Sequence, residues 1–203
     1  MGLEDLAPER ASEIRNAVKS KYRDVAKQPE GHFPYSIGRE SALNLGYDPS
    51  WLEEISDDVV ARFVGVGNPF RIRVPNPGER VLDAGCGCGL DTFVSSLLVG
   101  PTGQAAGVDF TAEMLKLPRA VASEFVRQNV EFREASIEKL PYADGIFDFV
   151  ISNGALNLVP DKKAAFSELS RVLKPEGILV SADLLVREEM PPDVIASKDA
   201  WST

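Results

Sequence analysis

The stretch from Arg80 to Leu90, Arg-Val-Leu-Asp-Ala-Gly-Cys-Gly-Cys-Gly-Leu, constrains the fold more than any other part of this 203-residue chain. It begins as an apolar strand and continues into a turn with glycine at positions 85, 87 and 89, here called the glycine turn. Glycine permits tight backbone turns and lets a ligand approach the main chain closely. Residues from Leu90 onward have helical character. Such a strand, turn and helix predict the cofactor-binding edge of an open α/β sheet.

Strand and helix patterns alternate after the turn Asn76-Pro77-Gly78. The predicted strands are residues 80–84, 104–108, 130–134, 146–152 and 178–186, and the predicted helices are 90–99, 112–128 and 161–173. Pro118 is expected to kink the second helix, and Pro175-Glu176-Gly177 to form a turn before the last strand. This alternation predicts an α/β, Rossmann-like, doubly wound fold with a mostly parallel sheet of about five strands.

The fifth predicted strand is followed by residues 187–203, which prolines and charges interrupt and which predict no further strand. Late strands of a doubly wound sheet are therefore expected to be missing. The apolar fifth strand would then form an open edge, and such an edge favours cover or pairing. A homodimer through this edge is one expectation.

The first 76 residues predict a separate helical segment. Apolar residues three and four positions apart between Pro8 and Lys27 mark one face of an amphipathic helix. The opposite face, with Glu13, Arg15, Lys19 and Lys21, is interpreted as solvent-facing. Short helices are expected at residues 39–45, after Asp48 and after Ser56. The predicted domains are a helical segment at 1–76, a cofactor-binding domain at 77–186 and a C-terminal tail at 187–203.

Composition and charge exclude several classes of protein. The net charge is −9 and the isoelectric point about 4.8, so the chain has no basic surface for nucleic acid or for an anionic membrane. No apolar run is long enough to span a bilayer, and the polar start does not resemble a signal peptide, so a cytoplasmic location is expected. Cys86 and Cys88 are the only cysteines and His32 the only histidine, which disfavours a disulfide or a zinc site.

Two acids distinguish between classes of nucleotide ligand. Asp109 ends the second predicted strand, where a carboxylate can accept hydrogen bonds from ribose hydroxyls, although it could also cap the helix beginning near Thr111. A dinucleotide site has the spacing Gly-x-Gly-x-x-Gly, whereas here glycine recurs at every second position after Asp83. Because an acid repels pyrophosphate but attracts a cation, the pattern favours an aminoacyl-sulfonium nucleoside over a nicotinamide dinucleotide.

Three motifs, at residues 81–89, at Gly107-Val108-Asp109 and at Leu-Lys-Pro-Glu-Gly (173–177), resemble those of class I S-adenosylmethionine-dependent methyltransferases. The resemblance spans residues 80 to about 185. Residues 109–115, 136–141 and 151–162 more narrowly resemble arsenite methyltransferases and their relatives. It implies S-adenosylmethionine as cofactor and a small-molecule methyl acceptor. The cofactor-binding residues that it implies are Asp83, Gly85, Cys86, Gly87, Gly89, Asp109, Phe110, Met114, Ser136, Ile137, Glu138 and Asn153.

The resemblance also implies which part of the cofactor each residue contacts. The glycine turn would take the methionine part, and Asp109 the ribose. Phe110 and Met114 would flank the adenine, with residues 136–138 at its edge. Asn153 would lie near the methyl group. The N-terminal segment, residues 9–70, would cover the strand ends as a lid, with Tyr22 and Tyr35 as pocket contacts.

The chain departs from the arsenite methyltransferases in its thiols. Trivalent arsenic is a soft metalloid that thiolates bind, and the family has a cysteine where this chain has Gly154. The family's other thiols lie before the glycine turn and beyond the region that corresponds to residue 203. This chain has no cysteine outside the turn, so we expect that on its own it does not methylate arsenite.

These residues are compatible with three functions to different degrees. A methyltransferase acting on a small molecule is favoured; because methyl transfer mainly requires alignment of donor and acceptor, a catalytic base is optional, and none is identified here. The alternative is a truncated, catalytically inactive S-adenosylmethionine-binding module that acts through a protein partner or a homodimer. A nicotinamide-dependent dehydrogenase is disfavoured by the glycine spacing and by Asp83.

Overall fold

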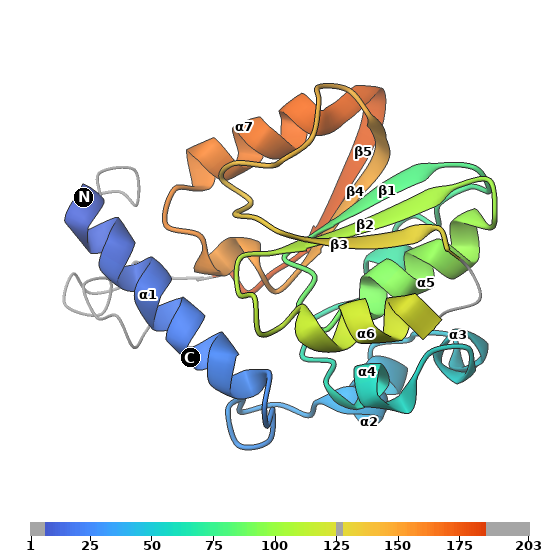
Figure 1. The fold of residues 1–203 in the computed structure, drawn as a ribbon, viewed down its shortest axis with the longest axis horizontal. Helices are drawn as coiled ribbons and strands as arrows, with labels where there is room; N and C mark the ends of the chain where they lie inside the picture. Colours follow the sequence, from blue (N-terminus) through green and yellow to red (C-terminus); the bar gives the residue numbers. More distant parts are fainter. Residues whose placement is uncertain (1–6, 125–127, 186–203) are drawn as a thin grey trace.

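The computed structural model describes residues 7–124 and 128–185, and its centre is one all-parallel sheet with the strand order β3-β2-β1-β4-β5 (Figure 1). The strands are β1 (Arg80–Ala84), β2 (Gln104–Asp109), β3 (Val130–Glu134), β4 (Phe147–Asn153) and β5 (Leu173–Ala182). The chain moves outward from β1 to β3, then returns to place β4 on the other side of β1. Open α/β sheets bind ligands at such a reversal, beside the carboxyl ends of the strands. The predicted Rossmann-like fold is confirmed.

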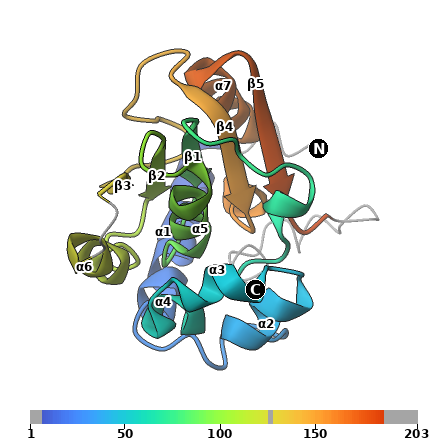
Figure 2. The same ribbon diagram turned by 90° about the vertical axis from the view of Figure 1, so that its right-hand side faces the viewer.

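Helices cover both faces of the sheet (Figure 2). One face packs against α5 (Leu90–Val99) and α6 (Lys116–Glu124), and the other against α7 (Lys162–Val172). Alternate residues of β1 point to opposite faces: Val81 belongs to the α5 side of the core and Leu82 to the α7 side. Because both faces are buried, the central strands are apolar along nearly their whole length.

The N-terminal helices occupy two places. They are α1 (Pro8–Val25), α2 (Gly38–Asn44), α3 (Pro49–Glu53), α4 (Asp57–Ala61) and the 3-10 turn η2 (Pro69–Arg71). Helices α2 to α4 extend the hydrophobic core on the α5 and α6 side, as the contacts α3–α5 and α4–α6 show. Helix α1 instead lies across the carboxyl ends of the strands (Figure 1). As predicted, Asp48 caps α3, where its carboxylate accepts a hydrogen bond from the Ser50 N–H at 2.8 Å.

The predicted start of the second helix, at residue 112, is wrong. Residues 112–115 form turns, and α6 begins at Lys116. Pro118 therefore falls in the first turn of α6, where backbone N–H groups have no partner within the helix, so proline neither costs a hydrogen bond nor kinks the helix. Residues 125–127, at the end of the predicted helix, lie outside the described part of the chain.

The predicted start of the last strand, at residue 178, is also wrong. Strand β5 begins at Leu173, directly after α7. On β4, Phe147 pairs with Leu173 and Phe149 with Ile178, so residues 174–177 form a bulge. Glu176 takes a φ of 67° within it. The sequence signal for a turn therefore marks a bulge inside the strand, which ends at Ala182.

The predicted end of the last strand, at residue 186, is wrong as well, because β5 ends at Ala182. The boundaries of β1 to β4, α5 and α7 agree with the prediction to within one residue. Strand β5 is an edge of the described sheet, and its Ile178 side chain is 43% exposed. Residues 186–203, which include the predicted tail, lie outside the described part of the chain. Within residues 7–124 and 128–185, no helix is long and apolar enough to cross a membrane. The cytoplasmic location stays a prediction.

Candidate cofactor-binding site

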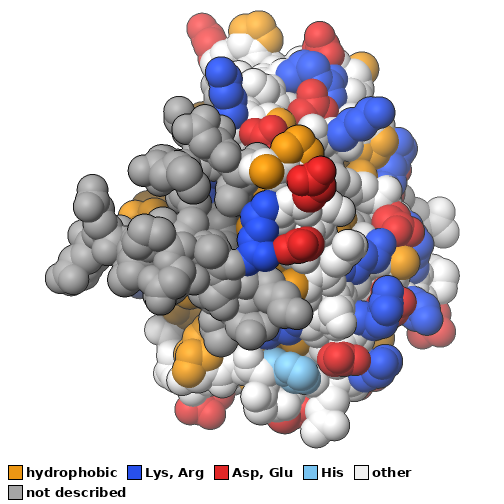
Figure 3. Space-filling view, turned by 90° about the vertical axis from the view of Figure 1, so that its left-hand side faces the viewer, with side chains coloured by type: hydrophobic (Ala, Val, Ile, Leu, Met, Phe, Trp, Pro, Cys, Tyr) orange, Lys and Arg blue, Asp and Glu red, His pale blue; other side chains and the backbone are white. Residues whose placement is uncertain are grey.

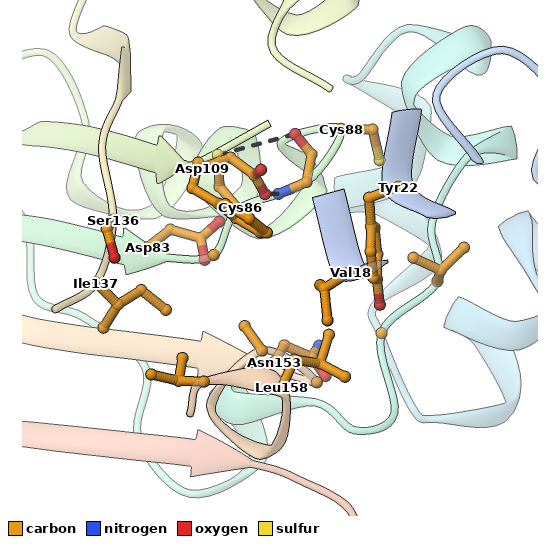
Figure 4. Close-up of a pocket in the computed structure, with 18 of the residues that line it drawn as sticks. Val18, Tyr22, Asp83, Cys86, Cys88, Asp109, Ser136, Ile137, Asn153 and Leu158 are labelled. Carbon is orange, nitrogen blue, oxygen red and sulfur yellow. Dashed lines mark hydrogen bonds between the residues drawn. The ribbon is translucent and has the colours of Figure 1, made fainter. Parts of the chain in front are cut away.

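A cavity lies at the carboxyl ends of β1, β2 and β4, and we call it the cofactor cavity (Figure 4). It holds about 960 Å³, including the part that is open to solvent. Helix α1 contributes Arg15, Val18 and Tyr22 to its wall, and so covers it from outside the sheet. Its size and its place at the reversal of strand order are typical of a site for a small organic ligand.

Ten of the twelve predicted cofactor-binding residues line the cofactor cavity. They are Asp83, Gly85, Cys86, Gly87, Asp109, Phe110, Ser136, Ile137, Glu138 and Asn153. The other two, Gly89 and Met114, do not line it. A Cβ at Gly89 would lie 2.8 Å from Phe132, so this glycine allows α5 to approach β3 closely. The Met114 methyl group lies 3.3 Å from where a Cβ on Gly87 would stand, so this side chain packs against the glycine turn.

The glycine turn is folded back against the end of β2. The N–H groups of Gly85 and Cys86 both donate to the Val108 carbonyl, at 2.8 and 2.9 Å. Gly85 has a φ of 83°, and a Cβ there would overlap the Ala155 side chain. Only glycine fits this backbone and this space. The turn therefore exposes main chain to the cavity at a fixed position.

Asp109 joins the glycine turn to the segment after β2. One carboxylate oxygen accepts from the Thr111 N–H at 2.8 Å and the other from the Gly87 N–H at 3.0 Å. Since α6 begins only at Lys116, Asp109 does not cap that helix. Each carboxylate oxygen can accept a second hydrogen bond, so both retain capacity for ligand hydroxyls. Burial raises the pKa of Asp109 to about 6.

Asp91 is a cavity-lining acid that the sequence did not reveal. It lies in the first turn of α5, where an acid is common because it complements the helix dipole. Its carboxylate accepts from the Tyr47 hydroxyl at 2.5 Å and from the Asn153 Nδ2 at 3.0 Å. Burial raises its pKa to about 6. The neighbouring Asp83 accepts from the Thr92 hydroxyl at 2.7 Å, and burial together with the charge of Asp91 raises its pKa.

Asn153 anchors the N-terminal segment to the sheet. Its side-chain oxygen accepts from the N–H groups of Val66 and Gly67, at 2.9 and 3.1 Å, and its Nδ2 donates to the Gly67 carbonyl at 2.8 Å. The side chain therefore lines the cavity while its amide is bonded to protein. No short-range pattern links β4 to residues so far away in the sequence, so this role could not be predicted.

Helix α1 is attached to the sheet domain by ion pairs. Arg15 donates twice to Glu138, at 2.6 and 2.9 Å, and Ser136 also donates to this carboxylate, at 3.1 Å. Two further pairs along the helix are Lys19–Glu134 at 3.7 Å and Arg23–Glu113 at 3.1 Å. Lys and Arg side chains lie among Asp and Glu on this face of the molecule (Figure 3). The prediction that Arg15 and Lys19 face only solvent is wrong.

Tyr22 and Tyr35 differ in their relation to the cavity. Tyr22 lines it, whereas the Tyr35 hydroxyl donates to the Val64 carbonyl at 3.3 Å and Tyr35 is not part of the wall. Burial raises the pKa of Tyr22, so its phenol is neutral near pH 7. His32 does not line the cavity.

The two thiols are buried beside the site. The Cys88 thiol donates to the Arg62 carbonyl at 3.2 Å and is turned toward α4, and burial raises its pKa to about 12. Burial also raises the pKa of Cys86 well above its usual value. Both thiols are therefore protonated near neutral pH. Within the described residues, no group of three or more His, Cys, Asp or Glu side chains could hold a metal ion.

The fold, the glycine turn and the acid at the end of β2 define a Rossmann-like domain that binds a nucleoside cofactor. Residues 75–202 match the family model described as a methyltransferase domain. The chain therefore belongs to the S-adenosylmethionine-dependent methyltransferases. S-adenosylmethionine is the cofactor of this family. The site fits it, because each Asp109 oxygen accepts only one hydrogen bond from the protein and can accept another from a ribose hydroxyl, and because the glycine turn lines the same cavity.

The chain is also similar to individual methyltransferases. The chain is 38% identical over 156 residues to an arsenite methyltransferase of Halobacterium salinarum, covering 77% of this chain and 40% of that protein. It is 33% identical over 201 residues to the mouse arsenite methyltransferase, covering 94% and 53%. The crystal structure of an arsenic(III) S-adenosylmethionine methyltransferase from Chlamydomonas reinhardtii matches with a TM-score of 0.66 and 35% identity, covering 71% and 51%. The chain spans about half the length of these relatives.

Proposed function

We propose that this chain transfers a methyl group from S-adenosylmethionine to a small, uncharged acceptor other than arsenite. The observation that carries the proposal is the cofactor cavity, in which the glycine turn and Asp109 face a space that α1 covers. When bound, S-adenosylmethionine supplies a methyl group on a positively charged sulfur, which activates it for direct displacement. The remaining work of the protein is to align the two reactants and to exclude water.

The order of the lining residues across the sheet supports one orientation of the cofactor. Asp109 at the end of β2 accepts the ribose hydroxyls, and the loop Ser136–Glu138 after β3 lies beside the adenine. Phe110, next to Asp109, packs on the base. The glycine turn and Asp83, at the end of β1, then receive the methionine part. The sulfur and its methyl group therefore lie toward Asn153 on β4.

The N-terminal segment acts as a lid in this proposal. Within residues 7–76, the part of this segment that the structure describes, α1 and residues 63–65 line the cavity. The Arg15–Glu138 pair fastens α1 beside the proposed adenine edge, and the Asn153 network holds the loop that follows Phe63. The lid and the sheet domain at 77–186 thus form the two walls of one site.

The nature of the cavity wall supports an uncharged acceptor. Val18, Tyr22, Phe63, Leu158 and Val159 give it an apolar surface beyond the glycine turn. Among the described lining residues the only cation is Arg15, which is already paired with Glu138. An anionic acceptor would lie near the carboxylates of the site with no positive charge to compensate the repulsion. Burial in the cavity would make the free energy of binding such an acceptor still less favourable.

The residues of the cavity wall also argue against arsenite as the methyl acceptor. Gly154, at the position of the family's cysteine, has a φ of 71° and carries no ligand atom. The thiols of Cys86 and Cys88 are protonated near neutral pH, and a neutral thiol is a poor ligand for a soft metalloid.

The test is methyl transfer from labelled S-adenosylmethionine by the purified chain. One reaction contains a small-molecule extract fractionated by polarity, and another contains arsenite with a thiol reductant. We expect label in a neutral, apolar fraction and none in arsenic species. Robust methylation of arsenite would contradict the acceptor, and cofactor binding without any transfer would favour the inactive binding module.

A homodimer through β5 is a separate proposal. It is supported by the position of β5 at the edge of the described sheet and by the exposure of Ile178. Sedimentation velocity tests it, and a monomer at 100 µM or above (roughly the range where weak dimers form) would contradict it.

A further inference from the structure

Helix α1 covers the cofactor cavity without belonging to the hydrophobic core of the sheet domain. Its buried apolar residues are Ala11, Ile14, Val18 and Val25. Within the described residues, none of the four belongs to either of the two hydrophobic clusters that pack on the faces of the sheet. The position of α1 over the cavity therefore depends on other contacts.

One face of α1 carries a row of cations that lies against acids of the sheet domain. Within residues 7–124 and 128–185, the ion pairs that join the two parts are Arg15–Glu138, Lys19–Glu134 and Arg23–Glu113. The cations follow one another at intervals of four residues, so they share one face of the helix over a length of about 12 Å. The acids come from three separate segments: the loop after β3, the end of β3 and the turn before α6. Every cation is on α1, so the three pairs attach the helix as one unit.

The carboxylate of Glu138 is fully used by donors of the protein. Its Oε1 accepts from Arg15 Nη2 at 2.6 Å and from the Asp161 N–H at 3.3 Å. Its Oε2 accepts from Arg15 Nε at 2.9 Å and from Ser136 Oγ at 3.1 Å. A carboxylate has about four acceptor sites, so none remains for a ligand, although Glu138 lines the cavity. Glu138 therefore joins three walls of the cavity: α1, the loop after β3 and the start of α7.

We propose that these three ion pairs form an electrostatic latch, and that α1 detaches from the acids each time the cofactor product leaves the cavity. The inference rests on the proposed function, which places S-adenosylhomocysteine beneath α1. The six residues are positioning residues, because they hold the helix and contact no reacting atom. Their side chains are between 13% and 49% exposed, so dissolved ions reach the pairs and screen them. Ionic strength therefore sets the rate of cofactor exchange.

The first measurement is the dissociation of labelled S-adenosylhomocysteine from the wild-type chain into an excess of the unlabelled compound at pH 7.5. This probe carries one ammonium and one carboxylate group and has no net charge, so salt has little direct effect on its attraction to the cavity. Raising the NaCl concentration from about 20 mM to about 500 mM should speed dissociation about 8-fold, since each of the three pairs weakens about twofold. A rate that changes less than twofold (the effect of about one weak pair) would overturn the inference.

The second measurement exchanges the charges of a pair outside the cofactor cavity. Neither Arg23 nor Glu113 lines it, so their substitution leaves the cavity wall intact. At low salt, Arg23→Glu should speed dissociation about 5-fold, and the double variant Arg23→Glu/Glu113→Arg should return the rate to within about twofold of the wild type. Failure of the second substitution to restore the rate would overturn the inference, because a latch requires only opposite charges at these two positions.

The matched control is Arg10→Glu. It makes the same change of charge on the same helix, but Arg10 pairs with Glu13 within α1 rather than with the sheet domain. Its dissociation rate should stay within about twofold of the wild type, and an acceleration equal to that of Arg23→Glu would contradict the latch. If S-adenosylhomocysteine does not bind to the wild-type chain at all, the proposed function fails. If it binds but dissociates at a rate that salt and these variants leave unchanged, only the latch fails.

Discussion

The substitution Asp109→Asn tests how the cavity holds the ribose. Asparagine has nearly the same shape as aspartate but loses the charge and replaces one acceptor oxygen with an NH₂ donor. In the native chain the two oxygens accept from Thr111 and Gly87. The variant therefore places a donor against one of these N–H groups, and it leaves one neutral oxygen for the two ribose hydroxyls.

The expected loss of affinity follows from these contacts. A hydrogen bond to a charged acceptor contributes about 1.5–3 kcal/mol, and one to a neutral acceptor about 0.5–1.5 kcal/mol. Losing one charged bond and weakening the other costs about 2–3 kcal/mol, which is about a 30- to 150-fold rise in Kd. Titration calorimetry with S-adenosylhomocysteine at pH 7.5 measures it. At this pH the Asp109 carboxyl group, with a pKa of about 6, is mostly ionised.

Folding must be measured beside binding. Asp109→Asn weakens the glycine turn but also removes a buried charge, so the two effects on the free energy of unfolding oppose each other. We expect the melting temperature to stay within about 5 °C of the wild type, since each kcal/mol shifts a chain of this size by roughly 2–4 °C. Asp57, which begins α4, has a side chain that is 94% exposed and does not line the cavity, so the control Asp57→Asn should bind like the wild type. An affinity of Asp109→Asn within threefold of the wild type (under about 0.7 kcal/mol) would refute the ribose assignment.

Three further predictions concern the lid, the buried acids and the thiol. Arg15→Ala removes the pair with Glu138 and should speed S-adenosylhomocysteine dissociation up to about 5-fold in stopped-flow measurements. An unchanged dissociation rate would show that the pair between α1 and Glu138 does not retain the ligand. Because burial raises the pKa of Asp91 and Asp109 to about 6, the folded chain binds more protons than the unfolded chain between about pH 4 and 6. The melting temperature of the ligand-free chain should therefore rise as the pH falls from 7.5 to 5.5, and a fall would contradict the burial of these acids. Gly154→Cys should destabilise the chain by about 1–2 kcal/mol, because φ is 71°, and should not produce arsenite methylation in the labelled-donor assay; arsenite turnover would contradict the account.

Local signals predicted the sheet domain well. The glycine turn could be predicted from residues 85–89 and their neighbours, because its backbone needs glycine at Gly85 and because β1 and α5 directly flank it. The errors arose where one local signal has two structural outcomes. Pro118 is compatible with a kink or with a first turn, and Pro175-Glu176-Gly177 with a turn or with a bulge.

The walls of the site were harder to predict because they join distant parts of the chain. The acids at strand ends are visible in the sequence, since a strand end fixes where the side chain lies. The bond between Asn153 and Gly67, and the pair between Arg15 and Glu138, depend on how the N-terminal segment packs against the sheet. A charged helix face looks the same in sequence whether it meets water or acids, so Arg15 could not be distinguished from a solvent-facing residue.

The central claim is that the cofactor cavity binds S-adenosylmethionine rather than a dinucleotide. The most direct measurement is calorimetric titration of the wild-type chain with S-adenosylmethionine and, separately, with NAD. We predict saturable binding of one S-adenosylmethionine per chain and no heat of binding with NAD. Binding of NAD, or no binding of S-adenosylmethionine, would contradict the account.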